Sequence, residues 1–449
     1  MEADEILQHM GGYGRFQGLV FLGLCFIYMR GAWPVMAILF LGGDPGHHCK
    51  IPVNSTLNQS IPGKMVDGVW TYDKCKIYVP ESGHNETQSC TSWSYGDEFK
   101  STILSEWNLV CDKDYLVDTS TTVYMVGNAV GAVTLTSLSD RFGRKHVMLL
   151  MLWIQGVIGF GAAYANSYIL FTVLRFFIAL LNMLPSNLFV VDNADSSAEH
   201  QSPTDQPGIS QDGLIGGPVA IVTQKKNYTV LDLFKTPTIR KYAIIMFYIW
   251  LANSLSYFGI LFATPTLHGN QFLNLGISGA VEIPALFICM FALETVGRKK
   301  PLIVFFFLCG IMNIATIFVP TTTESGVNLT PLIITLAMLG KFGITGSYSV
   351  SYLYSSEIFP TPVRNHALGL ASFFENTGGI VAPFIVYGAS KSTQYLPLVV
   401  FGTLTLIAGI LTFFLPETHQ RPLPETIEEV ENLKYTTPQT SNKPESTHL

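Results

Sequence analysis

Ionisable residues inside the long apolar stretches of this 449-residue sequence are its first candidates for chemistry. Glu282, Lys341 and Glu375 each lie within apolar runs of the kind that cross a lipid bilayer as helices. An ionised side chain is costly at that depth, so such a residue by default marks a pathway or a binding site. Together with the amide of Asn376, these residues predict recognition of a charged small molecule.

Aromatic side chains accompany these charges and extend the candidate site. The faces of Trp and Tyr attract an organic cation by about 0.5–2 kcal/mol each. Aromatic residues that face lipid or the protein core are the commoner case, so each one is a candidate contact only. The candidates are Tyr248, Trp250, Tyr257 and Phe258 in one apolar run, and Tyr348, Tyr352, Phe373 and Phe374 in two others.

Structural roles compete with substrate binding at each charged position. Glu282 precedes Pro284 by two residues and could serve a kinked helix as a hydrogen-bonding group. Lys341 could pair with a carboxylate such as Glu375 instead of touching substrate. Arg30 could extend its charged head to the membrane surface, and Arg175 is placed nearer the outer surface than the others.

Other chemistries lack the residue patterns that they need. His47 and His48 are adjacent without metal-ligand spacing, and no nucleophile motif is evident in the sequence. The sequence also lacks the Gly-rich phosphate-binding loop of ATP-driven pumps. A formal charge of −6 without a block of like charges excludes a nucleic-acid partner. The protein is therefore not expected to be an enzyme, and neither a cofactor nor a metal is expected.

Membrane-spanning helices are the elements that must position these residues. Charged residues make up 13% of the chain, against about 25% in soluble domains. A spanning helix needs roughly 20 mostly apolar residues. The sequence contains ten such candidates, namely Phe16–Leu41, Thr119–Leu138, Val147–Ala165, Tyr168–Val191, Tyr242–Ala263, Phe272–Leu293, Pro301–Val319, Thr330–Tyr352, Ala367–Ala389 and Tyr395–Leu415.

A hydrophilic segment, residues 42–118, separates the first two candidate spans. It holds four cysteines and three glycosylation acceptors, namely Cys49, Cys75, Cys90, Cys111, Asn54, Asn58 and Asn85. Their combination favours an oxidising, extracellular face. The segment is therefore predicted to be a disulfide-bonded, glycosylated outer loop, through which the protein could form a homo-oligomer. Four cysteines allow three pairings, and the sequence does not choose among them.

The other loops indicate the orientation of the chain. With residues 42–118 outside, the basic residues fall on cytoplasmic connections, as the positive-inside rule requires. They include Arg141, Arg144, Lys145, Lys225, Lys226, Lys235, Arg240, Lys241, Arg298, Lys299 and Lys300. Both termini are then cytoplasmic. Residues 1–191 are predicted to form an incomplete four-helix bundle, 192–241 a cytoplasmic linker, 242–415 a six-helix bundle and 416–449 a cytoplasmic tail.

A short motif occurs twice on the predicted cytoplasmic side. Its first copy contains Asp140, Arg141, Gly143, Arg144 and Lys145, and its second copy contains Glu294, Gly297, Arg298 and Lys299, an offset of 154 residues (294 − 140). Such repetition is typical of two parallel halves related by an axis along the membrane normal. In each copy Gly permits a tight turn and the acid could cap a helix N-terminus. Four helices follow the second copy but only two follow the first, so the first half is expected to lack two helices.

Further short motifs run along the whole chain. They are Gly14–Gln17, Pro45–Cys49, Ser105–Cys111, Asp140–Lys145, Leu231–Pro237, Val281–Ala285, Glu357–Asn365, Gly378–Phe384, Leu415–Thr418 and Pro422–Thr426. In these motifs the chain resembles the organic cation and carnitine transporter family of the major facilitator superfamily. The resemblance implies structural roles for Glu357 and Arg364, and it implies twelve helices, of which the fifth and sixth have no recognisable counterpart here.

The resemblance also bears on charge selectivity. Two residues before the glycine pair at Gly378, relatives that carry cations tend to have Asp, and anion or carnitine types tend to have Arg. Asn376 occupies this position and is neutral. The choice between a cationic and a zwitterionic substrate therefore stays open.

The predicted fold class is an all-α polytopic membrane protein with a major-facilitator-like two-bundle architecture. The leading hypothesis is transport of small organic cations or carnitine-like zwitterions across the plasma membrane by alternating access. Coupling to Na⁺ or H⁺ is left open. The rival hypothesis is a non-transporting, truncated or variant form that folds or associates with a full-length relative, because a missing helix pair would leave a breach in the first bundle.

Overall fold

A computed structural model describes most of the chain between residues 31 and 432. The described residues are 31, 33–52, 55–66, 69–79, 86–96, 101–142, 144–182, 230–267, 270–320, 327–390, 396–419, 421, 423–424 and 426–432. The described residues do not include most of the first predicted span, the end of the fourth or most of the predicted linker. Arg30, Asn54, Asn85 and Gly143 also lie outside them.

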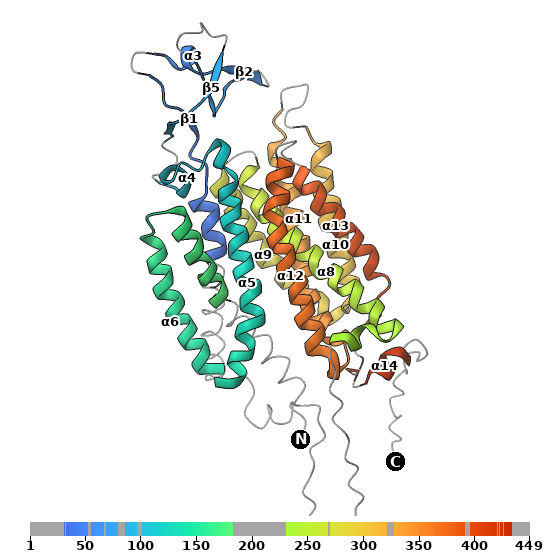
Figure 1. The fold of residues 1–449 in the computed structure, drawn as a ribbon. Helices are drawn as coiled ribbons and strands as arrows, with labels where there is room; N and C mark the ends of the chain where they lie inside the picture. Colours follow the sequence, from blue (N-terminus) through green and yellow to red (C-terminus); the bar gives the residue numbers. More distant parts are fainter. Residues whose placement is uncertain are drawn as a thin grey trace, which may run out of the picture.

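Two groups of roughly parallel helices stand side by side, with a small domain above them (Figure 1). The first group contains α5 (Tyr115–Phe142), α6 (Arg144–Ala163) and the helix Tyr168–Asn182. The second contains α8 (Pro237–Ala263), α9 (Gln271–Thr295), α10 (Lys299–Ala315), α11 (Thr330–Ile358), α12 (Thr361–Ser390) and α13 (Leu396–Thr412). Short 3₁₀ segments, η2 (Val230–Phe234), η3 (Thr264–Thr266) and η4 (Thr316–Phe318), flank the second group, and α14 (Ile427–Asn432) lies across its foot.

Six helices of the described chain are long and apolar enough to cross a membrane, and two shorter apolar helices accompany them. This agrees with the predicted all-α, polytopic class of the membrane part. The predicted total of ten spans is not tested, because the first span and the end of the fourth lie largely outside the described residues.

Local sequence signals explain where several of these helices begin. Pro237 stands in the first turn of α8, where its missing N–H is not needed. The side chain of Asn270 accepts hydrogen bonds from the backbone N–H groups of Phe272 and Leu273 and so caps α9. Gly297 has a φ of +105°, which a residue with a side chain rarely adopts, and it allows the turn into α10.

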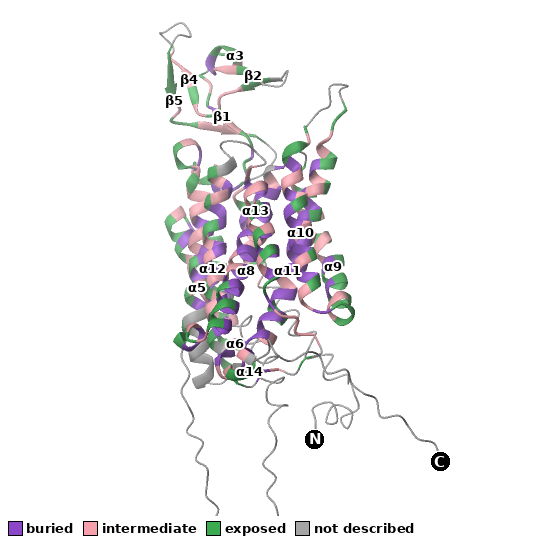
Figure 2. Ribbon diagram, turned by 90° about the vertical axis from the view of Figure 1, so that its right-hand side faces the viewer, coloured by how far each residue is buried: buried purple, intermediate pink, exposed green. Residues whose placement is uncertain are grey.

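Burial differs sharply between helices of the second group (Figure 2). In its most apolar stretch α8 has 72% of its residues buried, whereas α9 has only 17%. The difference arises because α8 packs against α11, α12 and α13, whereas α9 packs mainly on α11. Large apolar side chains such as Phe287 and Phe291 are consequently exposed on α9, as expected for a helix that faces lipid.

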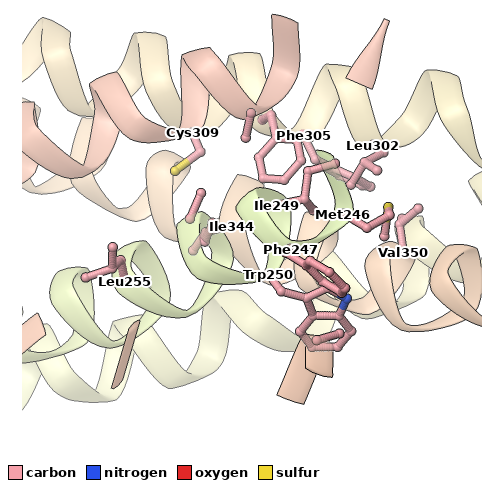
Figure 3. Close-up of a cluster of buried hydrophobic side chains, with 14 of the residues drawn as sticks. Met246, Phe247, Ile249, Trp250, Leu255, Leu302, Phe305, Cys309, Ile344 and Val350 are labelled. Carbon is pink, nitrogen blue, oxygen red and sulfur yellow. The ribbon is translucent and has the colours of Figure 1, made fainter. Parts of the chain in front are cut away.

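The core of the second group is built around α8 (Figure 3). Met246 and Ile249 lie on the side of α8 that faces Leu302 and Phe305 of α10, whereas Phe247 and Trp250 lie together on another side. Close backbone approach strengthens this packing: a Cβ atom at Gly343 of α11 would come within 2.7 Å of the Cys309 backbone nitrogen. The position of Trp250 matters for the site below, because the core packing fixes the rotation of α8.

The outer domain contains three two-stranded antiparallel sheets, which the sequence interpretation did not foresee. β1 (His47–Cys49) pairs with β6 (Trp93–Tyr95), β2 (Gly63–Val66) with β3 (Val69–Tyr72), and β4 (Lys76–Tyr78) with β5 (Thr87–Ser89). Short helical segments, α3 (Leu57–Ser60), α4 (Ile103–Glu106) and η1 (Cys111–Lys113), complete it. Disulfides join Cys49 to Cys90 and Cys75 to Cys111.

Contacts between the two groups of helices involve α5 and α12. At the outer ends, the Tyr387 hydroxyl of α12 donates a hydrogen bond of 2.7 Å to Asp114, which directly precedes α5. Phe40 and Phe272, each at the outer end of its helix, stack with ring centroids 5.9 Å apart. Deeper, a Cβ atom at Gly379 would lie 3.3 Å from the sulfur of Met125.

Candidate functional site

An ion pair between α9 and α11 forms the first part of the site. The Lys341 ammonium lies 2.9 Å from a Glu282 carboxylate oxygen, and the Lys341 side chain is fully buried whereas that of Glu282 is 28% exposed. A buried ammonium is tolerable only when it is paired. Lys341 does pair with a carboxylate, but the partner is Glu282 and not Glu375, the example considered from the sequence.

Tyr257 of α8 touches both members of this ion pair. Its hydroxyl donates a hydrogen bond of 2.9 Å to Glu282, and the centre of its ring lies 3.4 Å from the Lys341 nitrogen. The ring thus adds a cation–π contact to the ion pair. Tyr257 joins three helices at one point.

Glu375 of α12 has different neighbours. Its carboxylate accepts hydrogen bonds from the hydroxyls of Tyr348 and Tyr352 of α11, the second over 3.1 Å. Among the described residues, no Lys, Arg or His forms an ion pair with Glu375. Hydroxyl groups stabilise a carboxylate without cancelling its charge.

Four aromatic residues, the aromatic cluster, connect these two carboxylates. They are Trp250, Tyr257, Tyr348 and Tyr352. The Trp250 ring lies perpendicular to that of Tyr352 at 4.5 Å and near that of Tyr348 at 5.8 Å. Tyr348 in turn lies 5.5 Å from Tyr257, ring centre to ring centre. The arrangement places aromatic surface from α8 and α11 between Glu282 and Glu375.

A polar seam between α8 and α11 holds the aromatic cluster, and the sequence interpretation missed it. The Trp250 indole donates to Ser355 over 2.8 Å, and the Asn253 amide bonds Ser351 and Ser347 over 2.8 Å each. The signal in the sequence was the spacing of the three serines, four residues apart, which places them on one face of a helix. Because these polar groups are fully buried, they fix the mutual register of the two helices.

Other predicted site residues lie outside the aromatic cluster. The Tyr248 hydroxyl donates to the Leu404 carbonyl of α13, and the Asn376 amide donates to the Ser372 carbonyl of its own helix. Phe374 stacks on Phe247 at 5.2 Å, and Phe373 is 55% exposed. Phe258 contacts the cluster edge through Tyr257.

The second copy of the repeated motif forms a polar junction at the foot of the second group. Arg298 binds Glu357 of α11 through its Nε and Nη2 atoms, with distances of 3.1 and 2.9 Å to one carboxylate oxygen. The backbone N–H groups of Arg298 and Lys299 are capped by Glu417, not by Glu294, which is exposed and was the expected cap. The cap comes from far along the chain because the segment after α13 folds back against α10.

The other motif residues are located on the helices as follows. Arg364 is buried, and its Nε donates to the Phe359 carbonyl over 3.3 Å. Asp140 and Arg141 end α5, and Arg144 and Lys145 begin α6, on either side of Gly143, which lies outside the described residues.

In the outer domain, Asp44 organises the region beside β1. It accepts from the Lys74 ammonium over 2.9 Å and pairs with His47 over 3.0 Å. Burial raises the pKa of Asp44, but these hydrogen bonds and the Lys74 charge outweigh it and hold that pKa well below its ordinary value. Asn58, the one predicted glycosylation acceptor among the described residues, accepts a hydrogen bond from Tyr72.

The model of one transporter family, "Sugar (and other) transporter", matches residues 73–187 and 219–430 of this chain. The organic cation transporter protein of Drosophila melanogaster is 29% identical over 532 residues, which cover 96% of this chain and 95% of the relative. The organic cation/carnitine transporter 2 of Mus musculus is 28% identical over 531 residues, covering 96% and 94%. A solved structure of the proton:xylose symporter XylE has a TM-score of 0.48 and 14% identity, covering 72% of this chain and 90% of that one.

The alignment with the Drosophila relative and the match to the family model each contain a gap. The aligned length of 532 exceeds the 449 residues of this chain by 83 (532 − 449), so the Drosophila relative has at least that many residues without a counterpart here. The family match is also interrupted between residues 187 and 219. The interruption falls where the internal repeat predicts two helices to be missing.

Proposed function

Because this chain belongs to the sugar (and other) transporter family, we propose that it carries small organic cations or carnitine-like zwitterions across the plasma membrane. It is a multi-pass membrane transporter and not an enzyme. In this proposal both termini are cytoplasmic, and the two groups of helices rock about a central site to give alternating access.

The Glu375 carboxylate beside the aromatic cluster is the observation that carries the proposed substrate class. Its hydrogen-bond donors are tyrosine hydroxyls, so a positive charge from outside the protein can supply the missing counter-ion. Aromatic faces add about 0.5–2 kcal/mol each to the binding of a quaternary ammonium group. The names of the relatives, organic cation and carnitine transporters, support the same class.

The ion pair of Glu282 and Lys341 has a positioning role in this proposal. Because the two charges cancel, they leave Glu375 as the centre of negative potential in the site. Tyr257 touches the ion pair and also lies in the aromatic cluster, so the ion pair holds one wall of the site in place.

Uptake of labelled tetraethylammonium and carnitine tests the proposal in cells where surface expression has been confirmed. We expect saturable uptake by the wild type and a loss of at least about tenfold in Glu375→Gln, because one charge-assisted contact contributes 1.5–3 kcal/mol. Glu294→Gln is the matched control, since Glu294 is exposed at the foot of the second group. Unchanged uptake in Glu375→Gln, or equal loss in the control, would contradict the assignment.

A second candidate function follows from the gap in the sequence comparisons. At least 83 residues of a full-length relative have no counterpart here, which is enough for a pair of spanning helices. The chain would then be a non-transporting form that associates with a full-length relative. Surface protein with background uptake of both probes would favour it, and a transcript sequence across residues 191–225 that restores two helices would remove it.

A further inference from the structure

Arg175, in the middle of the helix Tyr168–Asn182, is a buried charge without a counter-ion among the described residues. It is only 5% exposed. Its Nε and Nη2 atoms have no hydrogen-bond partner in the part of the chain that the structure describes. A guanidinium stays ionised in proteins, so Arg175 does not escape the cost of a buried charge by losing a proton.

The two unpartnered atoms are the ones that make a carboxylate-binding fork. Nε and Nη2 lie on the same edge of the guanidinium plane and can donate two parallel hydrogen bonds to one carboxylate. Arg298 shows this use in the same molecule, because its Nε and Nη2 both donate to Glu357. In Arg175 the equivalent edge faces no acid of the described chain.

The surroundings of Arg175 stabilise the cation only in part. Its guanidinium carbon lies 4.9 Å from the centre of the Tyr124 ring and 5.8 Å from that of Phe171. These contacts act on the face of the guanidinium and leave the edge donors unsatisfied. A planar oxyanion at the edge would satisfy the Nε and Nη2 donors of Arg175 together.

Across the interface between the two groups of helices, Arg175 is related to the proposed cation site through α5 and α12. Tyr124, which faces Arg175, is followed by Met125, whose sulfur would lie 3.3 Å from a Cβ atom at Gly379. Gly379 follows Glu375 by four residues on α12, which is one helical turn or about 6 Å. The Glu375 carboxylate and the Arg175 guanidinium therefore lie on opposite sides of the α5–α12 contact, and Glu375 is about one helical turn from the level of Gly379.

We propose that the Arg175 edge is the carboxylate subsite for a zwitterionic substrate whose ammonium group binds at Glu375. This inference rests on the proposed function and narrows its substrate class. A zwitterion with separated charges satisfies both buried groups at once, whereas a simple cation satisfies only one.

Binding by the purified full-length protein tests the proposal independently of transport. The midpoint of thermal unfolding is followed against the concentration of carnitine, which has an ammonium and a carboxylate, and of choline, which has only the ammonium. Arg175→Lys keeps the charge but loses the fork. We expect this variant to bind carnitine about 10- to 100-fold more weakly and choline with unchanged affinity.

Two further measurements separate a binding role from a structural one. Without ligand, Arg175→Met is expected to unfold at the wild-type temperature or above, since it removes an uncompensated charge. Acetate, a carboxylate without an ammonium, is expected to compete with carnitine in the wild type.

Each possible result either supports or overturns the assignment of the carboxylate subsite to Arg175. Equal loss of carnitine and choline binding in Arg175→Lys, full retention of carnitine binding, or acetate binding without carnitine binding would each overturn the proposal. Selective loss of carnitine binding in a protein that shows no uptake would support this subsite while refuting transport.

Discussion

Arg298 at the foot of the second group and Arg175 inside the first group use the same side chain in opposite ways. The fork of Arg298 is filled by Glu357, and the backbone N–H groups of Arg298 and Lys299 donate to Glu417. The fork of Arg175 is empty among the described residues, although Arg175 is the more buried of the two. A charge that is paired within the protein, as in Arg298, joins two helices, whereas the buried charge of Arg175 has no counter-ion in the described part of the chain.

Glu282 and Glu375 repeat this contrast on the acidic side. Glu282 is paired with Lys341, whereas Glu375 is held by two tyrosine hydroxyls. Both carboxylates contact the aromatic cluster. The presence of a counter-ion at Glu282, and not the aromatic contact, distinguishes the two residues. If the distinction is correct, changes at paired charges should reduce stability and changes at open charges should reduce binding.

The largest loss of stability is expected for Lys341→Met. The variant leaves the Glu282 carboxylate without its counter-ion, at a cost of about 3 kcal/mol. In Lys341→Met/Glu282→Gln both charges are gone, and most of that loss should be recovered. Thermal unfolding of the purified proteins in detergent measures both effects. Additive losses in the double variant would show that the two residues do not act as a pair.

A smaller loss is expected for Arg298→Gln. The side chains of Arg298 and Glu357 are 19% and 14% exposed, so solvent reduces the cost of breaking the pair to about 2 kcal/mol. Lys300→Gln is the matched control, because Lys300 is exposed two residues later and forms no ion pair among the described residues. Equal unfolding temperatures for the two variants would break the comparison between Arg298 and Arg175.

The smallest effect is expected at the junction of α14 with α8, and it depends on pH. Glu431 accepts hydrogen bonds from the backbone N–H groups of Thr238 and Ile239. Burial raises the pKa of Glu431, but these bonds and those with the side chains of Thr238 and Thr236 outweigh it and lower that pKa. The cap therefore contributes fully above the ordinary glutamate pKa of about 4.3 and is lost as pH falls through the lowered value.

Hydrogen exchange across residues 427–432 measures this junction. The ratio of protection between the wild type and Glu431→Gln should exceed one near neutral pH and approach one in acid. A ratio that does not change with pH would mean that the Glu431 charge does not hold α14 in place.

Features that depend on runs of neighbouring residues could be predicted well. The apolar runs indicated helices, and α8, α10 and α11 match the predicted spans within a few residues at most ends. The motif at Gly297 and Arg298 indicated a tight turn, and the positive φ of Gly297 agrees with it. Such features follow from the local balance between backbone hydrogen bonding and the solvent around each run.

Features that depend on which helix faces rest on one another could not be predicted. Lys341 was given Glu375 as a candidate partner, yet Glu282 is the residue that reaches it. Tyr248 and Trp250 are two residues apart, and the rotation of α8 directs one to α13 and the other to the aromatic cluster. A helix turns by about 100° per residue, so a small error in its rotation reassigns every contact.

The sequence by itself determined that the protein lives in a membrane, which residues carry charge there, and which family its motifs resemble. Those properties depend on composition and on the local order of residues, because each polar or charged group is costly in the hydrocarbon core of the membrane. Only the tertiary structure decided which charges cancel and which stay open, because pairing requires side chains from different helices to meet. The fork of Arg298 is filled and that of Arg175 is open for this reason alone: packing brings Glu357 to the first, and no described acid to the second.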